Sequence, residues 1–126
     1  MSNYKGSLLL DTGASGMMID EAIASTLNLP VQGEEEVHGA HGYGFLRKYI
    51  GRLVLPVVDN SGEALALRIP VECTGMPQLS EHYSHEGISV IGVLGRNFLQ
   101  FCNIEIDGLS GQVTVRIDKS VLLPRE

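Results

Sequence analysis

Asp11 is the residue whose surroundings best suit acid–base chemistry. It follows three consecutive leucines, Leu8–Leu10, and a short turn containing Thr12, Gly13 and Gly16 comes after it. A carboxylate at the end of a buried strand has neighbours that can tune its protonation, and glycines let the backbone fold closely around it. Asp-Thr-Gly alone is more typical of an ordinary strand followed by a tight turn. The flanking sequence decides between these two interpretations.

Aliphatic runs lie on both sides of this turn, within Leu8–Ile19, and Ala14 and Ser15 stand between them. The stretch resembles the active-site loop of the aspartic proteases. A second stretch, Ile88–Leu99, is similar to the second signature of the retroviral-type members, in which two hydrophobic residues and a glycine lead into a short helix. Both signatures occur in the family's order and separation. The chain therefore resembles a single-lobed, retropepsin-like aspartic protease.

The resemblance implies roles for two groups of residues. The catalytic group would be Asp11, Thr12 and Gly13, with Thr12 hydrogen-bonding into the loop of a partner chain and Gly13 helping to hold the acid in place. Ala14 and Ser15 would border the substrate groove. The glycine-rich segment that contains His41, Gly42 and Tyr43 lies where the family has its flap, so these three residues are also expected to contact substrate.

Two triplets fit the second signature, Val90-Ile91-Gly92 and Val93-Leu94-Gly95. The resemblance selects the later one, because its glycine leads into Arg96 and Asn97. We expect the site to be supported by Leu94, Gly95, Arg96 and Asn97.

Elementary chemistry adds a requirement for a second acid. Peptide hydrolysis by carboxylates needs one ionised acid to take a proton from water and one protonated acid to polarise the carbonyl. Asp11 is the only acid in such a setting, and Asp107-Gly108 lacks the hydroxyl residue between acid and glycine. The second acid is therefore expected from another copy of the chain in a C₂ homodimer that cleaves a peptide or polyprotein substrate. The alternative is a non-catalytic member of the same fold that binds peptides or dimerises a larger protein.

Composition limits the class of protein. The 126 residues predict a single domain over 1–126, with 44% hydrophobic and 19% charged residues. A net charge of −6 with no basic cluster argues against nucleic acid, and the short apolar runs argue against membrane insertion. We expect no cofactor, two reduced buried thiols at Cys73 and Cys102, and, since no signal-peptide pattern opens the chain, a cytoplasmic location.

The hydrophobic pattern predicts an all-β fold, a retropepsin-like closed β-barrel or sandwich lobe with one or two short helices. A helix is expected over 21–28, with Asp20 as N-cap, and a second one beginning at Gly95. Alternation over 37–58 predicts a long hairpin with a glycine-rich tip, interpreted as the flap, and Glu34–Glu36 is expected to be a solvated loop or strand entry. Further strands are expected over 64–71, 88–94, 103–107 and 112–117.

The polar segment 74–87 is expected to be a surface loop. His82 and His85 within it are flanked by acids, but their spacing is a weak signal for metal binding. No metal site is predicted.

Overall fold

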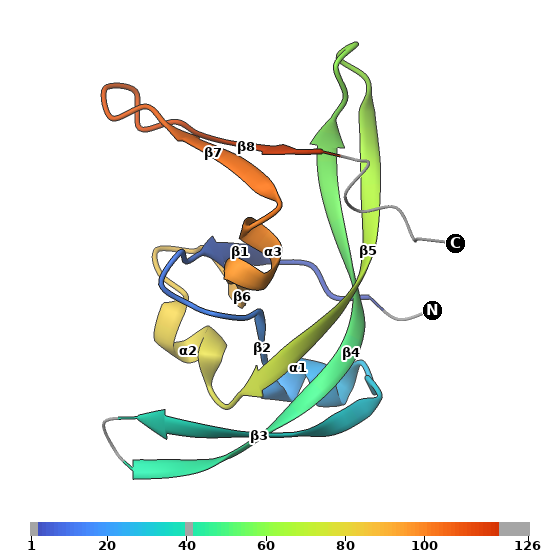
Figure 1. Cartoon of the computed structure of the whole chain (residues 1–126), viewed down its shortest axis with the longest axis vertical. Coiled ribbons are helices and arrows are strands. Elements are labelled where there is room, and N and C mark those ends of the chain that lie inside the picture. The colour runs from blue at the N-terminus through green and yellow to red at the C-terminus, as the bar shows by residue number, and fades with distance from the viewer. Residues whose placement is uncertain (1–2, 40–41, 119–126) are drawn as a thin grey trace.

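The computed structural model describes residues 3–39 and 42–118 and is mostly β-structure (Figure 1). Its elements, in chain order, are β1 (Ser7–Leu10), β2 (Met18–Asp20), α1 (Glu21–Thr26), β3 (Val31–Gly39), β4 (Gly42–Val58), β5 (Ala64–Met76), α2 (Leu79–Tyr83), β6 (Val90–Leu94), α3 (Arg96–Leu99), β7 (Cys102–Ile106) and β8 (Val113–Ile117). No helix in these ranges is long and apolar enough to cross a membrane.

Six strands form one sheet in the order β1-β6-β2-β5-β4-β3, and β7 pairs with β8 in a separate two-stranded sheet. β6 lies between β1, to which it is parallel, and β2, to which it is antiparallel. The chain therefore leaves β1, passes over the end of β6 and returns on its other side as β2. The loop that makes this passage contains Asp11.

Long hairpins extend from this central part in two directions (Figure 1). β4 pairs with β3 over its first half and with β5 over its second half. The β4–β5 turn is fixed by the Asp59 carboxylate, which accepts hydrogen bonds from the Ser61 and Glu63 amides at 2.9 Å. Such a turn is typical of an aspartate followed by Ser and Gly.

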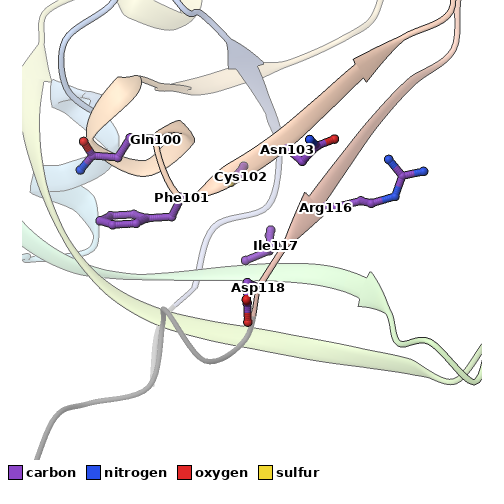
Figure 2. A pocket seen from close by; sticks show the side chains of 7 residues that line it. All are labelled: Gln100, Phe101, Cys102, Asn103, Arg116, Ile117 and Asp118. Atoms are coloured by element: carbon purple, nitrogen blue, oxygen red, sulfur yellow. The ribbon is translucent and has the colours of Figure 1, made fainter.

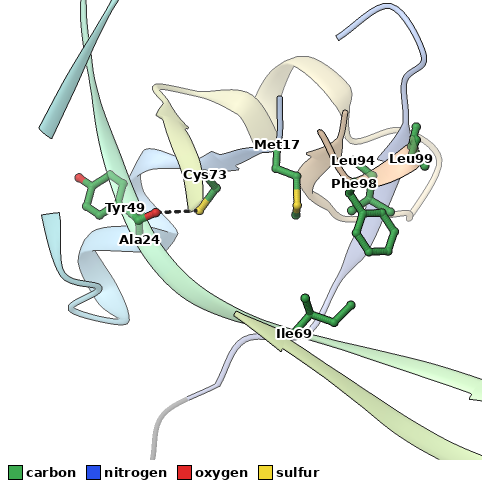
Figure 3. Packing of buried hydrophobic residues seen from close by; sticks show 8 residues of the cluster. All are labelled: Met17, Ala24, Tyr49, Ile69, Cys73, Leu94, Phe98 and Leu99. Atoms are coloured by element: carbon green, nitrogen blue, oxygen red, sulfur yellow. Dashed lines mark hydrogen bonds between the residues drawn. The ribbon is translucent and has the colours of Figure 1, made fainter. Parts of the chain in front are cut away.

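The main core consists of eight buried residues from α1, β4, β5, β6 and α3 and from the loop before β2 (Figure 3): Met17, Ala24, Tyr49, Ile69, Cys73, Leu94, Phe98 and Leu99. A smaller cluster consists of Leu79, Val90 and Val93. Both clusters contain residues of β6, so this strand contributes to the core on both of its faces. Burial on both faces explains why its sequence is a continuous apolar run. The site loop is thus attached to the most buried strand.

Several sequence predictions are confirmed. Asp20 is the N-cap of α1 and accepts hydrogen bonds from the Ala22 and Ile23 amides. Gly95 precedes α3, and the last hairpin forms as expected. Both cysteines are free thiols, although Cys102 is only half-buried.

The expected closed barrel is wrong for the described residues. β1 and β3 are the two edges of the six-stranded sheet, and the β7–β8 ladder pairs with neither of them. The described chain has three short helices rather than one or two. Closure depends on pairing between distant strands, which the local hydrophobic pattern does not encode.

The predicted loop over 74–87 is also wrong in part, because its first residues continue β5 and α2 follows. Leu79 provides the reason: its side chain is 0% exposed and packs against Val90 and Val93. The backbone amide of Ser80 donates to the carboxylate of Asp20 at 2.9 Å. One apolar anchor and one distant hydrogen-bond acceptor therefore order a segment that is otherwise polar.

The hairpin predicted over 37–58 begins earlier, at Val31, so Glu34–Glu36 belong to β3, where all three are exposed. The predicted helix over 21–28 ends at Thr26, because Leu27 is its C-cap and Asn28 has a φ of 55°. The turn of the β3–β4 hairpin, with His41, lies outside the described residues. Its role as a flap stays a prediction.

Candidate active site

Asp11 lies directly after β1, with its carboxylate at the start of the connecting loop. Its backbone amide donates to the carbonyl oxygen of Leu94 at 3.1 Å, which continues the β1–β6 pairing by one residue. The Gly13 amide donates to Asp11 Oδ1 at 2.9 Å, and the Ala14 amide donates to the Asp11 carbonyl at 3.2 Å. Asp11 is half-buried, so its position is fixed while its side chain can still be reached from solvent.

The start of α3 binds the other end of this loop. The Arg96 amide donates to the Ala14 carbonyl at 2.8 Å, and the Asn97 amide donates to the Ser15 carbonyl at 3.1 Å. The first amides of a helix have no partner within the helix and are free to donate elsewhere. Arg96 and Asn97 of the second signature therefore support the loop through their backbone amides.

Gly95 is packed against the loop as well. A Cβ atom there would lie 2.6 Å from the carbonyl carbon of Gly16. This contact explains why the later of the two competing triplets is the one beside the site. Gly92, from the earlier triplet, lies instead beside β2, where a Cβ atom would be 2.7 Å from the Met18 carbonyl oxygen.

The remaining predicted residues of the loop differ in exposure. Thr12, Gly13 and Ser15 are exposed, whereas Ala14 is half-buried and packs against the Leu79 cluster. Arg96 is exposed, and no ion pair joins its guanidinium to an acidic residue within the described ranges. The structure thus brings one predicted group together, namely the Asp11 loop and the four residues Leu94, Gly95, Arg96 and Asn97.

The structure does not test whether the predicted flap residues approach this group. His41 lies outside the described residues. The backbones of Gly42 and Tyr43 begin β4, opposite Gly39 and His38 of β3. Their contact with substrate stays a prediction.

The hollow in Figure 2 is not at the Asp11 loop. It has a volume of about 520 Å³ and lies between the end of α3 and the β7–β8 hairpin, where its lining includes Phe101, Asn103 and Arg116. None of its lining residues belongs to the predicted site. The side chain of Arg116 is already paired with Glu105 at 2.8 Å. The chemistry of Asp11, rather than the size of a hollow, defines the site.

Metal-binding chemistry has little support in the described ranges. No group of three His, Cys, Asp or Glu side chains gathers there in an arrangement that could hold a metal ion. His85 Nε2 lies 3.4 Å from the Glu86 carboxylate, and both side chains are more than 80% exposed.

A polar pair that sequence reasoning missed lies where β4 passes α1. The Tyr49 hydroxyl donates to Glu21 Oε1 at 2.6 Å, although the two residues are 28 positions apart. Glu21 reads as an ordinary acidic residue in the first turn of a helix, and Tyr49 reads as a strand residue. No local signal relates them.

Comparison with known families identifies the class of protein. The family described as aspartyl protease matches residues 2–98, which include the Asp11 loop and all of the second signature except Leu99. The chain belongs to this retropepsin-like aspartyl protease family. Comparison with curated proteins gives no match.

Proposed function

We propose that the chain is an aspartic endopeptidase whose active site forms between two identical subunits. The observation that carries this proposal is the anchoring of half-buried Asp11 at the end of β1. Its main chain is hydrogen-bonded to Leu94 and Ala14, and its carboxylate accepts one hydrogen bond, from the Gly13 amide. Family membership supports a peptide as the substrate. A binding module has no physical need for an acid that is anchored in this way at the edge of the core.

The dyad would consist of Asp11 from each subunit. Two carboxylates that are forced together share one proton, because like charges at close range do not both ionise cheaply. The ionised group then removes a proton from a water molecule while the protonated group polarises the peptide carbonyl. Thr12 and Gly13 fix the geometry of the pair, and Ala14 and Ser15 border the peptide. The β3–β4 hairpin is the flap that excludes water.

A substitution at Asp11 tests this function. Asp11→Asn keeps the shape of the side chain and removes the ability to share a proton. We expect hydrolysis of a peptide library to fall by at least about a thousandfold while the unfolding midpoint stays close to that of the unchanged chain. A peptide mimic that carries a hydroxyl in place of the scissile carbonyl should inhibit the unchanged chain.

Asp107→Asn is the matched control, because Asp107 is an exposed acid that also precedes a glycine. It should retain full activity. If a folded Asp11→Asn protein hydrolyses peptides at nearly the unchanged rate, the aspartic mechanism is refuted. If the unchanged chain binds the mimic without cleaving any peptide, the non-catalytic binding domain is the correct alternative.

A further inference from the structure

The β3–β4 hairpin leaves the six-stranded sheet at two adjacent residues of β4. β4 pairs with both β3 and β5 at Lys48 and Tyr49, whereas from Arg47 to Gly42 it pairs only with β3. We call residues 34–39 and 42–47 the arm, and Lys48 with Tyr49 the hinge rung. A two-stranded ribbon without a third strand is only marginally stable in water. The arm can therefore bend at the hinge rung, where its support by β5 begins.

A partly buried polar cluster contacts the hinge rung on the core side of the sheet. Tyr49, which is 2% exposed, donates its hydroxyl hydrogen to Glu21 Oε1 at 2.6 Å. Arg47 Nη1 lies 3.9 Å from the same oxygen. The other carboxylate oxygen, Oε2, is buried and has no hydrogen-bond partner in the described chain. Loss of the Tyr49 hydroxyl would therefore leave the Glu21 carboxylate with little compensation for its burial.

The space around Glu21 is matched to its carboxylate. Gly75 on β5 lies directly beside it, and a Cβ atom at position 75 would come 3.1 Å from Glu21 Cδ and 2.7 Å from the Tyr49 ring. The absence of a side chain at this position of β5 leaves room for the bond between α1 and β4. Glu21 thus connects three elements at the hinge rung.

A second contact lies on the solvent side of the hinge rung. Thr74 Oγ1 on β5 donates to Glu35 Oε2 on β3 at 2.7 Å, so the bond spans the intervening strand β4. Next to it, Lys48 Nζ forms an ion pair with Glu72 at 2.9 Å. Glu35 belongs to the arm and Thr74 belongs to the supported part of the sheet. Their bond therefore resists rotation of the arm away from β5.

We propose that Glu21 and Glu35 are positioning residues that set the angle of the arm, one by fixing the hinge rung from the core side and the other by tying the arm to β5. In Figure 1 the arm and the loop between β1 and β2 extend toward the same side of the molecule. The consequence for catalysis rests on the proposed function, in which the arm closes over a peptide at Asp11. Release of either bond favours the open arm and weakens peptide binding, while the chemical step at Asp11 is unchanged.

Hydrogen exchange of the full chain, followed by mass spectrometry, tests the hinge. Tyr49→Phe removes the hydroxyl and keeps the ring in the core, whereas Glu35→Ala and Thr74→Val each remove the solvent-side bond. We expect arm amides to exchange about three- to tenfold faster in each variant. Exchange in the β7–β8 ladder should stay unchanged as an internal reference.

Glu81→Ala is the control, because it truncates the same kind of side chain at an exposed position of α2, outside the arm. It should leave arm exchange unchanged. Unchanged arm exchange in the three hinge variants would overturn the proposal. Equal acceleration in the arm and in β7–β8 would also overturn it, because the bonds would then stabilise the whole fold rather than the arm.

Peptidase kinetics provide an independent readout. The hinge variants should raise KM by about the same factor as arm exchange, with kcat retained at saturating peptide. A loss of kcat with unchanged KM would contradict the positioning role. If the unchanged chain has no peptidase activity, the proposed function fails, and the exchange data still decide whether these residues position the arm.

Discussion

Gly95 lies directly against the backbone of Gly16. A Cβ atom at position 95 would come within 2.6 Å of the Gly16 carbonyl carbon and within 2.9 Å of its nitrogen. Both partners in this contact are main chain, which cannot rotate away as a flexible side chain can. The loop that carries Asp11 and the turn that begins α3 are therefore closed on each other at a point where only glycine fits.

Replacement of Gly95 should be strongly destabilising. Gly95→Val forces the Asp11 loop and the β6–α3 turn apart, and overpacking of this kind costs about 3 kcal/mol. Urea unfolding, measured by circular dichroism, checks the value. Gly108→Ala is the control, because nothing lies within 4 Å of a Cβ atom there. An unchanged midpoint for Gly95→Val would contradict the close contact.

The earlier triplet requires a separate readout. Because a Cβ atom at Gly92 would also meet backbone, at the Met18 carbonyl oxygen, unfolding alone does not distinguish the two triplets. Their locations do. Gly95→Ala should accelerate hydrogen exchange in the Asp11 loop, whereas Gly92→Ala should act on the pairing of β6 with β2.

The parts of the fold that sequence predicted well are those in which local signals agree. Three leucines followed by Asp-Thr-Gly mark the end of β1, and an apolar run followed by Gly95 marks the passage from β6 to α3. Asp20 before Glu21 marks the start of α1, because a short acceptor at the N-cap satisfies amides within its own turn. Each of these features depends on residues only a few positions apart.

The features that sequence missed depend on distant partners. α2 follows Gln78, which has a φ of 62° and makes no side-chain cap. Its start is instead determined by the burial of Leu79 and the bond from Ser80 to Asp20. The hinge contacts Glu21–Tyr49 and Glu35–Thr74 likewise join residues that are 28 and 39 positions apart. Periodicity identifies the strands but does not say which side chains meet across them.

Asp20 connects two helices, and its removal should reveal both connections. Its Oδ1 accepts the first amides of α1, and its Oδ2 accepts the Ser80 amide at the start of α2. Asp20→Ala should cost about 3 kcal/mol. Asp20→Asn should cost about 1.5 kcal/mol, because an amide oxygen still caps α1 while the amide nitrogen does not accept from Ser80.

The contribution of Asp20 should depend on pH. Burial alone would raise the pKa of Asp20, but hydrogen bonds from Ser80, Ile23 and Ala22 outweigh burial and hold the pKa below its usual value of 3.8. A carboxyl group with a lowered pKa stabilises the fold above its unfolded-state pKa, and this stabilisation is lost as pH falls through the folded-state value. The stability difference between the unchanged chain and Asp20→Asn should therefore be full above about pH 5 and shrink below pH 3.8. A difference that grows as the solution is acidified would contradict this assignment.

Cys73 should be almost unreactive in the folded chain. Burial, followed by the charge of Glu72, raises the pKa of its thiol to about 11, so roughly one molecule in a thousand carries the reactive thiolate at pH 8. Its S–H group also faces the Tyr49 carbonyl oxygen at 3.8 Å (Figure 3). Alkylation at pH 8 should label the half-buried Cys102 first, and both thiols should react at similar rates in urea. Labelling of Cys73 in the folded chain at its unfolded rate would contradict this burial.

The two-subunit site predicts how activity responds when subunits are mixed. If each active site needs one Asp11 from each chain, a subunit with Asp11→Asn inactivates every dimer that it enters. Exchange of unchanged chains with a threefold excess of Asp11→Asn should reduce activity to roughly one quarter, because that share of unchanged chains still meets an unchanged partner. Asp107→Asn in the same excess is the control and should inhibit nothing. Dilution through the dimer dissociation constant should also lower specific activity, with sedimentation reporting the monomer fraction. Activity that is unaffected by the Asp11→Asn excess, under conditions in which labelled subunits are seen to exchange, would show that a single chain carries the complete site.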